Sequence, residues 1–208
     1  MAVSNRPPGQ LDSTSALAPY TGPWNDRMAA HLLRRAGFGG SPQEVSRFSS
    51  MRMHDAVEAL VHFPPANMPT PDVFDPYSAG LLPLARGQQM SMDDMARRQR
   101  AQDLRKEARQ NIIALQQWWL NRMLTTNAPL QEKMTFFFHG HYTSAAIQKG
   151  IWPSYIFNQN QLFRTYALGN LRDLTLAVSK DPAMLIYLDN ALSNAQHPNE
   201  NYARELME

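Results

Sequence analysis

The sequence predicts an all-α protein, an irregular multi-helix bundle with one long helix. Three observations support this class. From Trp24 onward, apolar residues recur at the three- and four-residue spacing of amphipathic helices. Several expected helix starts carry a capping Ser, Asp or Asn next to a proline. Alternating runs rich in Val, Ile or Thr are missing from the sequence, so no strand is expected.

The composition is typical of a folded globular protein. Of the 208 residues, 43% are hydrophobic and 18% are charged, which is enough apolar material for one sizeable core. The 20 basic and 18 acidic side chains give a net charge of +2, too small an excess to indicate nucleic-acid binding. The sequence contains no cysteine, so disulfides, iron–sulfur clusters and haem attached through cysteines are excluded.

The chain is expected to divide into an arm and one helical domain. Residues 1–23 are rich in Pro, Ser and Gly and are predicted to form a flexible N-terminal arm. They lack the basic start and apolar run of a signal peptide, and no later stretch reaches the ~18 apolar residues of a transmembrane helix. We therefore expect neither feature in this chain, and the sequence leaves its localisation open. Residues 24–208 are predicted to form the helical domain.

Three short helices are expected before residue 64. The first, from Trp24, carries its apolar residues on one face and ends at the glycines that begin with Gly37. In the second, Ser41 can cap the helix while Glu44 reaches back to the cap amide. The third, about residues 51–62, should bury one apolar stripe. Its members are Ala56, Val57, Leu60 and Val61.

A proline-rich loop and a long helix follow. Six prolines between Pro64 and Pro83 rule out regular structure, so residues 64–90 are predicted to be a loop insertion. From Ser91 no Gly or Pro appears until Pro129, which predicts a helix of more than thirty residues. Its first half is densely charged and should be exposed. Its second half should be packed through its apolar residues, which are Ile112, Ile113, Leu115, Trp118, Trp119, Leu120, Met123 and Leu124.

Further helices are predicted in the C-terminal part. Their ranges are 129–140, 154–168, 170–179, 181–189 and a last one from His197-Pro198. Asp181 is expected to cap its helix. The last helix is still amphipathic at Glu208, with no residue that closes it, so we expect the chain to be truncated within that helix.

Four segments of the sequence resemble the signature blocks of a bacterial family called domain of unknown function 1800. They are residues 31–39 (HLLRRAGFG), 129–141 (PLQEKMTFFFHGH), 181–190 (DPAMLIYLDN) and 199–208 (NENYARELME). The resemblance covers about residues 24–208. It implies a large, uncharacterised, mainly helical bacterial protein, of a kind that is often exported and often encoded beside sulfatase-like proteins. It also implies that this chain corresponds to the incomplete N-terminal part of a larger domain, with an exposed apolar edge at Tyr202, Leu206 and Met207.

His139 and His141 are the first candidate site residues. Neutral imidazole is a common ligand of divalent metals, and His-x-His is a common ligand spacing. Residues two apart point in nearly opposite directions in a helix, so the two can share a metal only if the helix ends between them. In the alternative interpretation, His139 bonds a carbonyl at the helix end and His141 lies on the surface.

The last helix supplies the second candidate group. Asn201, Arg204, Glu205 and Glu208 recur at helical spacing and form a polar stripe. Glu205 could act as a ligand or general base, and Arg204 could bind an anionic substrate. In the alternative interpretation the stripe is a solvated face held by the pairs Glu200–Arg204 and Arg204–Glu208. Asp189 could approach the histidines if its segment packs beside them.

Two functions remain open at the level of sequence. The first is a hydrolase-like enzyme, of which this chain is a fragment, with a His/carboxylate site that holds a divalent metal. The second is a non-catalytic helical binding or scaffold module that assists a sulfatase-like partner. If the histidines and the stripe on the last helix converge on one cleft, the enzyme is favoured. If they lie apart, the module is favoured.

Overall fold

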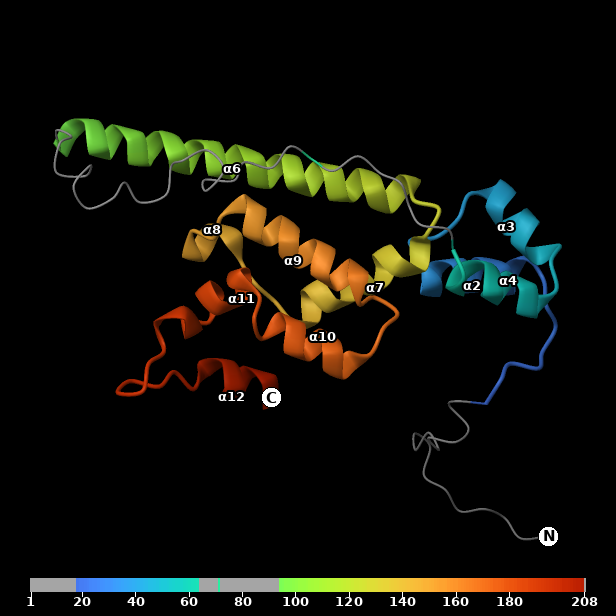
Figure 1. The fold of residues 1–208 in the computed structure, drawn as a ribbon. Helices are drawn as coiled ribbons and strands as arrows, with labels where there is room; N and C mark the ends of the chain where they lie inside the picture. Colours follow the sequence, from blue (N-terminus) through green and yellow to red (C-terminus); the bar gives the residue numbers. More distant parts are fainter. Residues whose placement is uncertain (1–17, 64–70, 72–93, 208) are drawn as a thin grey trace, which may run out of the picture.

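The computed structural model describes residues 18–63, 71 and 94–207, and these residues contain helices and no strand, which confirms the all-α prediction. Helix α6 lies across helices α7, α8 and α9, while α2, α3 and α4 gather at one end of the molecule (Figure 1). Helices α10, α11 and α12 lie on the side away from α6. The bounds are α2 Asp26–Ala36, α3 Pro42–Ser49, α4 Met53–Val61, α6 Asp94–Thr125, α7 Pro129–His141, α8 Ala146–Lys149, α9 Pro153–Thr165, α10 Leu171–Val178, α11 Pro182–Tyr187, the 3-10 helix η1 Asn190–Leu192 and α12 Asn201–Met207.

The starts of the first helices follow from local hydrogen bonds. Asn25 caps α2 by accepting a bond from the Met28 amide at 3.2 Å. Ser41 and Glu44 form the predicted capping box, with the Ser41 amide donating to Glu44 Oε2 at 2.8 Å and the Glu44 amide donating to Ser41 Oγ at 3.2 Å. Because these bonds join residues three apart, the sequence alone was sufficient to predict the start of α3.

One hydrophobic core lies among the first three helices. Its buried members are Ala29, Leu33, Phe48, Ala56 and Leu60. Helix α4 contributes only one narrow side to this core, so Val57 and Val61 remain 38% and 40% exposed. The prediction that both valines are buried is therefore wrong.

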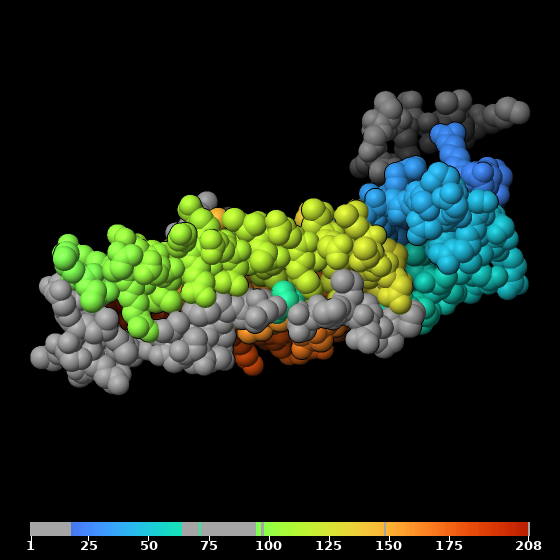
Figure 2. Space-filling model, turned by 90° about the horizontal axis from the view of Figure 1, so that it is seen from above, coloured from blue at the N-terminus to red at the C-terminus, as the bar shows by residue number. Residues whose placement is uncertain are grey.

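Helix α6 spans 32 residues, which confirms the predicted long helix. Ile112 and Leu115 on its inner side are buried, and its charged first half is exposed as expected. The side of α6 that faces away from the other helices is turned to the viewer in Figure 2. Ile113, Leu120 and Leu124 are exposed. The prediction that these three residues are packed is wrong. At 100° per residue they point away from the direction of Leu115, and α7 and α9 pack only on the inner side.

The second core joins α7 to the C-terminal helices. Its buried members are Phe138, Tyr142, Phe163, Leu174, Val178 and Met184. Tyr202 of α12 packs against this core, and its hydroxyl lies 2.6 Å from Ser179 Oγ. Leu206 and Met207 are exposed. The prediction that Tyr202 belongs to the exposed edge is wrong, because its ring is half-buried against this core.

The helix boundaries near the C-terminus differ from the prediction. Helix α11 ends at Tyr187, and α12 begins at Asn201 rather than at His197-Pro198. The later start follows from Asn199, whose Oδ1 accepts from the Asn201 amide at 2.8 Å while its Nδ2 donates to the Leu188 carbonyl at 2.9 Å. The short helix α8 was not anticipated.

Some expectations lie outside the described residues: the flexible arm up to residue 17, the proline-rich loop apart from Pro71, and Glu208. No helix in the described part of the chain combines the length and the apolar character that crossing a membrane requires.

Candidate functional site

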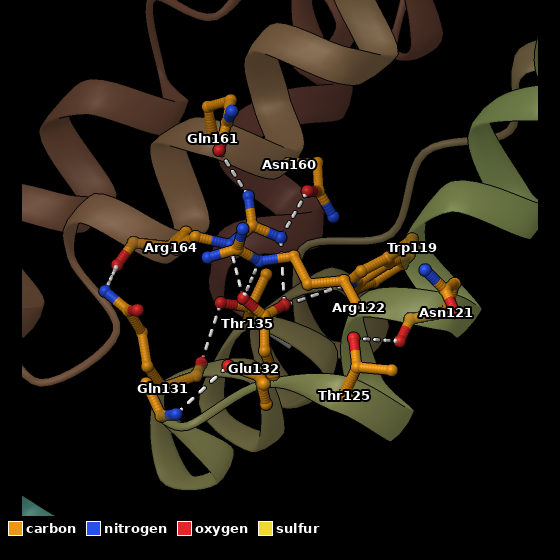
Figure 3. A network of polar contacts seen from close by, with 12 residues as sticks. Trp119, Asn121, Arg122, Thr125, Gln131, Glu132, Thr135, Asn160, Gln161 and Arg164 are labelled. Atoms are coloured by element: carbon orange, nitrogen blue, oxygen red, sulfur yellow. Dashed lines mark hydrogen bonds and ion pairs between the residues drawn. The ribbon is translucent and has the colours of Figure 1, made fainter. Parts of the chain in front are cut away.

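Three charged side chains meet in the interior, where α6, α7 and α9 pack together. Glu132 of α7 is fully buried, and Arg122 of α6 and Arg164 of α9 are also buried. Arg164 donates from Nε to Glu132 Oε1 at 2.6 Å and from Nη2 to Oε2 at 2.9 Å, and Arg122 donates from Nε to Oε1 (Figure 3). We call these three residues the ionic centre.

Neutral side chains complete the hydrogen bonding around the ionic centre. Trp119 Nε1 donates to Glu132 Oε2 at 3.1 Å, so the carboxylate accepts four hydrogen bonds in all, which is the number that its two oxygens accommodate. Asn160 Oδ1 accepts from Arg164 Nη2 at 2.7 Å, and Gln161 Oε1 also accepts from Arg164.

The ionic centre holds two positive charges and one negative charge, which leaves one excess positive charge in the interior. The face of Trp118 lies close to both guanidinium groups, with its ring centroid 5.9 Å from Arg122 Cζ and 5.5 Å from Arg164 Cζ. The electron-rich ring and the amide oxygens therefore stabilise the charge that Glu132 does not balance.

The protonation state of Glu132 follows from its surroundings. Burial by itself raises the pKa of Glu132, but the hydrogen bonds and positive charges of Arg164 and Arg122 outweigh burial and hold the pKa below its ordinary value. The carboxylate is therefore ionised at neutral pH, and all its acceptor positions are used. Such a group holds three helices together and is not free to accept a proton from a substrate.

A second buried polar chain runs from Ser144 through Gln159 to Asp181. Ser144 Oγ donates to Gln159 Oε1, and Gln159 Nε2 donates to Asp181 Oδ2 at 2.7 Å. The same Asp181 oxygen accepts from the Met184 amide at 2.9 Å, which confirms Asp181 as the cap of α11. Burial raises the pKa of Asp181, and its hydrogen bonds offset only part of that rise.

The two candidate histidines occupy different sides of α7. This helix continues through His141, so it does not end between them. The ring centroid of His139 lies 5.2 Å from that of Trp119 and 6.2 Å from that of Phe163, and burial lowers the pKa of His139. The exposed His141 stacks on Phe137, with ring centroids 5.8 Å apart. Among the described residues there is no group of three or more potential metal ligands, so metal binding by the pair stays a prediction.

Arg204 and Glu205 of α12 are exposed, Asn201 is half-buried, and the three residues contact one another. Arg204 Nη2 lies 3.4 Å from both Glu205 Oε1 and Asn201 Oδ1. Within the described part of the chain, no hydrogen bond, ion pair or ring contact joins Arg204 or Glu205 to His139 or His141.

Asp189 does not contact the histidines either. Its carboxylate forms an ion pair with Lys149 of α8, with Nζ and Oδ2 2.7 Å apart. Asp189 has a φ of 58°, so it turns the chain between α11 and η1. Its role in this structure is to connect these segments to α8.

Helix α7 carries two exposed aromatic rings at adjacent positions. Phe136 and Phe137 are 52% and 55% exposed. Phe136 contacts the rings of Phe38 and Trp119 at centroid distances of 6.5 and 6.0 Å. We define the aromatic face of α7 as Phe136, Phe137 and His141 of this helix together with Phe38, which contacts Phe136.

The sequence contains one signal for the aromatic face of α7 and one for the ionic centre. Successive residues of a helix point 100° apart, so the run of phenylalanines from Phe136 to Phe138 cannot be buried on a single side. Glu132, Thr135 and Phe138 recur every three residues along the buried side of α7, and a charged residue on a buried side indicates a buried partner. The identity of that partner could not be predicted, because Arg122 and Arg164 lie ten and 32 residues away.

The fold and these contacts define a helical protein with a buried ionic centre, in which every acceptor position of the Glu132 carboxylate is occupied. Helix α7, which carries Glu132, also carries exposed aromatic rings. Residues 31–208 match the family described as "Protein of unknown function (DUF1800)". The chain belongs to this family, which confirms the resemblance of the four segments. No curated protein and no solved structure matches the chain.

Proposed function

We propose that this chain is a helical binding module that docks a partner protein on the aromatic face of α7. The observation that supports this proposal is the exposure of Phe136 and Phe137, each more than half accessible at adjacent positions of α7. Adjoining exposed aromatic side chains are typical of protein interfaces, where they supply a large share of the binding energy.

The aromatic face has a rigid support. Glu132, one helical turn before Phe136 on α7, is bonded to two other helices, and Phe136 rests against Trp119 of α6. A surface that is already ordered loses little conformational entropy when a partner binds. The ionic centre would therefore serve binding indirectly, by holding α7 in place.

The chemistry of the partner surface follows from the residues beside the rings. Lys133 Nζ lies 5.2 Å from the centroid of Phe38, which places a positive charge at the edge of the aromatic face. A complementary surface has an apolar centre and an acidic residue at its rim. The family resemblance suggests a sulfatase-like protein as the partner.

The test is a binding measurement with a double variant. A purified sulfatase-like protein encoded beside a member of this family is immobilised, and binding of the full chain is measured by biolayer interferometry. Phe136→Ala/Phe137→Ala should weaken binding by at least tenfold, in line with the ~2 kcal/mol or more of an interface hot spot.

The control is Leu192→Ala, which removes a side chain that is 77% exposed in a different part of the molecule. This variant should bind as the parent chain does, and circular dichroism should show that both variants are folded. Equal binding by the double variant and the parent would contradict the aromatic face as the docking site. No binding by the parent would contradict the sulfatase-like partner.

A hydrolase-like enzyme with a divalent metal is the second candidate. The observation in its favour is the lowered pKa of His139, which keeps the imidazole neutral at pH 7, the form that ligates a metal or accepts a proton. In this function His139 and His141 are ligands or acid–base groups, Glu205 is the carboxylate partner and Arg204 contacts an anionic substrate. The function requires these groups to approach one another.

Metal retention tests this second candidate. The full chain is equilibrated with Zn, Mn, Fe and Cu ions in turn, and bound metal is measured by mass spectrometry after desalting. Stoichiometric metal that is lost in His139→Ala/His141→Ala would support the enzyme. Absence of bound metal, or equal retention by the variant, would refute the metal site.

A further inference from the structure

A groove of 840 Å³ lies between α6 and the segment that runs from α8 to the start of α9. One wall comes from α6, where Leu104, Ala108 and Ile112 recur every four residues and so share one side of the helix. The other wall includes Ile147 and Ile151. The described residues of the α6 wall therefore include an apolar strip along the groove, formed by Leu104, Ala108 and Ile112, which we call the apolar floor.

Three cationic side chains also line this groove. Arg105, Lys106 and Arg109 belong to α6, and all three are exposed. None of them forms an ion pair with another described residue, and none of the described residues that line the groove is acidic. Of the nearby acids on α6, Asp103 instead accepts a hydrogen bond from Gln99 at 3.1 Å. The groove therefore combines apolar walls with a positive charge that none of its described lining residues balances.

We infer that this groove binds a single-chain amphiphilic anion. The acyl chain lies along the apolar floor, and its carboxylate or phosphate head contacts Arg105, Lys106 and Arg109. The lining of α6 extends from Ala101 to Ile112, which corresponds to ~16 Å at the helical rise per residue. The volume falls in the ~300–1,000 Å³ range of small-molecule sites.

Charge complementarity and the apolar floor together select this class of ligand. A fully polar anion would leave Leu104, Ile112 and Ile151 exposed to water, whereas an uncharged alkane would leave the three cations without a partner. The inference goes beyond the proposed docking function and does not depend on it, because the groove and the aromatic face share no residue.

The first measurement is calorimetric titration of the full chain with sodium dodecanoate below its micelle concentration. Dodecanoate should bind saturably, and decanoate, with two fewer methylenes, should bind roughly three- to tenfold more weakly because less apolar surface is buried. Dodecanol, which has the same chain without a charge, should bind at least tenfold more weakly than dodecanoate. Dodecyl phosphate should bind as well as dodecanoate.

Variants locate the site. Arg105→Gln/Arg109→Gln should weaken dodecanoate binding by about tenfold or more and leave dodecanol binding unchanged. The matched control is Arg98→Gln/Arg100→Gln, which removes the same charges from exposed positions of α6 that do not line the groove, and it should have little effect. Ile147→Asp, at a residue that is already exposed, should weaken binding of both ligands.

Tryptophan fluorescence gives an independent readout, because Trp152 lines the groove. The quencher 11-bromoundecanoate should reduce the emission of the parent chain, and most of this quenching should be lost in Trp152→Phe. Several results would overturn the inference. They are no saturable binding of dodecanoate, equal effects of the groove and control arginine variants, binding to anionic vesicles without binding to dodecanoate, and binding of an acidic amphipathic peptide in place of dodecanoate.

Discussion

The substitution Glu132→Gln tests how strongly the ionic centre stabilises the fold. Glutamine keeps the size of the side chain and one acceptor oxygen, but its amide nitrogen is a donor and would face the donors of Arg122, Arg164 or Trp119. The two buried guanidinium groups would then have no negative partner in the centre. Removal of one member of a buried ion pair costs about 3–5 kcal/mol because the other charge stays in the interior.

That loss is a large fraction of the free energy of unfolding of a typical folded protein, which is ~5–15 kcal/mol. For a urea dependence of ~2 kcal/mol per molar, it corresponds to a midpoint that falls by about 1.5–2.5 M. The assay is urea unfolding at pH 7, followed by far-ultraviolet circular dichroism. Glu205→Gln removes an exposed carboxylate and should change stability by no more than ~0.5 kcal/mol.

A triple variant separates the cost of an unpaired charge from the value of the intact centre. Arg122→Met/Glu132→Leu/Arg164→Met replaces all three charges by apolar side chains and leaves no charge in the ionic centre. It should recover most of the stability that Glu132→Gln loses. A loss below ~1 kcal/mol for Glu132→Gln, or a triple variant less stable than the single one, would refute the reasoning.

Three further predictions concern pH and local contacts. The pKa of Glu132 is lowered in the folded state. Its contribution to stability is therefore present above the ordinary carboxyl pKa of ~4.3 and is lost as pH falls through the folded pKa. Acid should lower the urea midpoint of the parent chain more than that of the triple variant. The pKa of Asp181 is raised, so its contribution is present below its ordinary pKa and is lost as pH rises through the folded pKa. Asp181→Asn keeps the cap acceptor without the charge and should be at least as stable as the parent at pH 7, whereas Asp181→Ala should lose ~1–2 kcal/mol in thermal or urea unfolding. Tyr202→Phe removes the hydroxyl that contacts Ser179 and should speed amide hydrogen exchange in α12, with no change in α2 as the control.

Helix existence was largely predictable, while the polar surroundings of the candidate residues were not. The α6 prediction succeeded because the absence of Gly and Pro is a local property of the sequence. The sequence also identified His139 as a candidate, but its contacts with Trp119 and Phe163 depend on how α6 and α9 pack on α7. The start of α12 was misplaced because its position depends on the bond from Asn199 to the Leu188 carbonyl, eleven residues earlier.

The sequence by itself determined where several helices begin, because Ser41, Asn170 and Asp181 act on backbone amides two or three residues ahead. Only the tertiary structure decided which side of each helix is buried. Ile113 and Leu120 are as apolar as Ile112, but no described helix packs over their side of α6. The ionic centre was likewise decided by packing, because a buried carboxylate needs cations that approach from other helices.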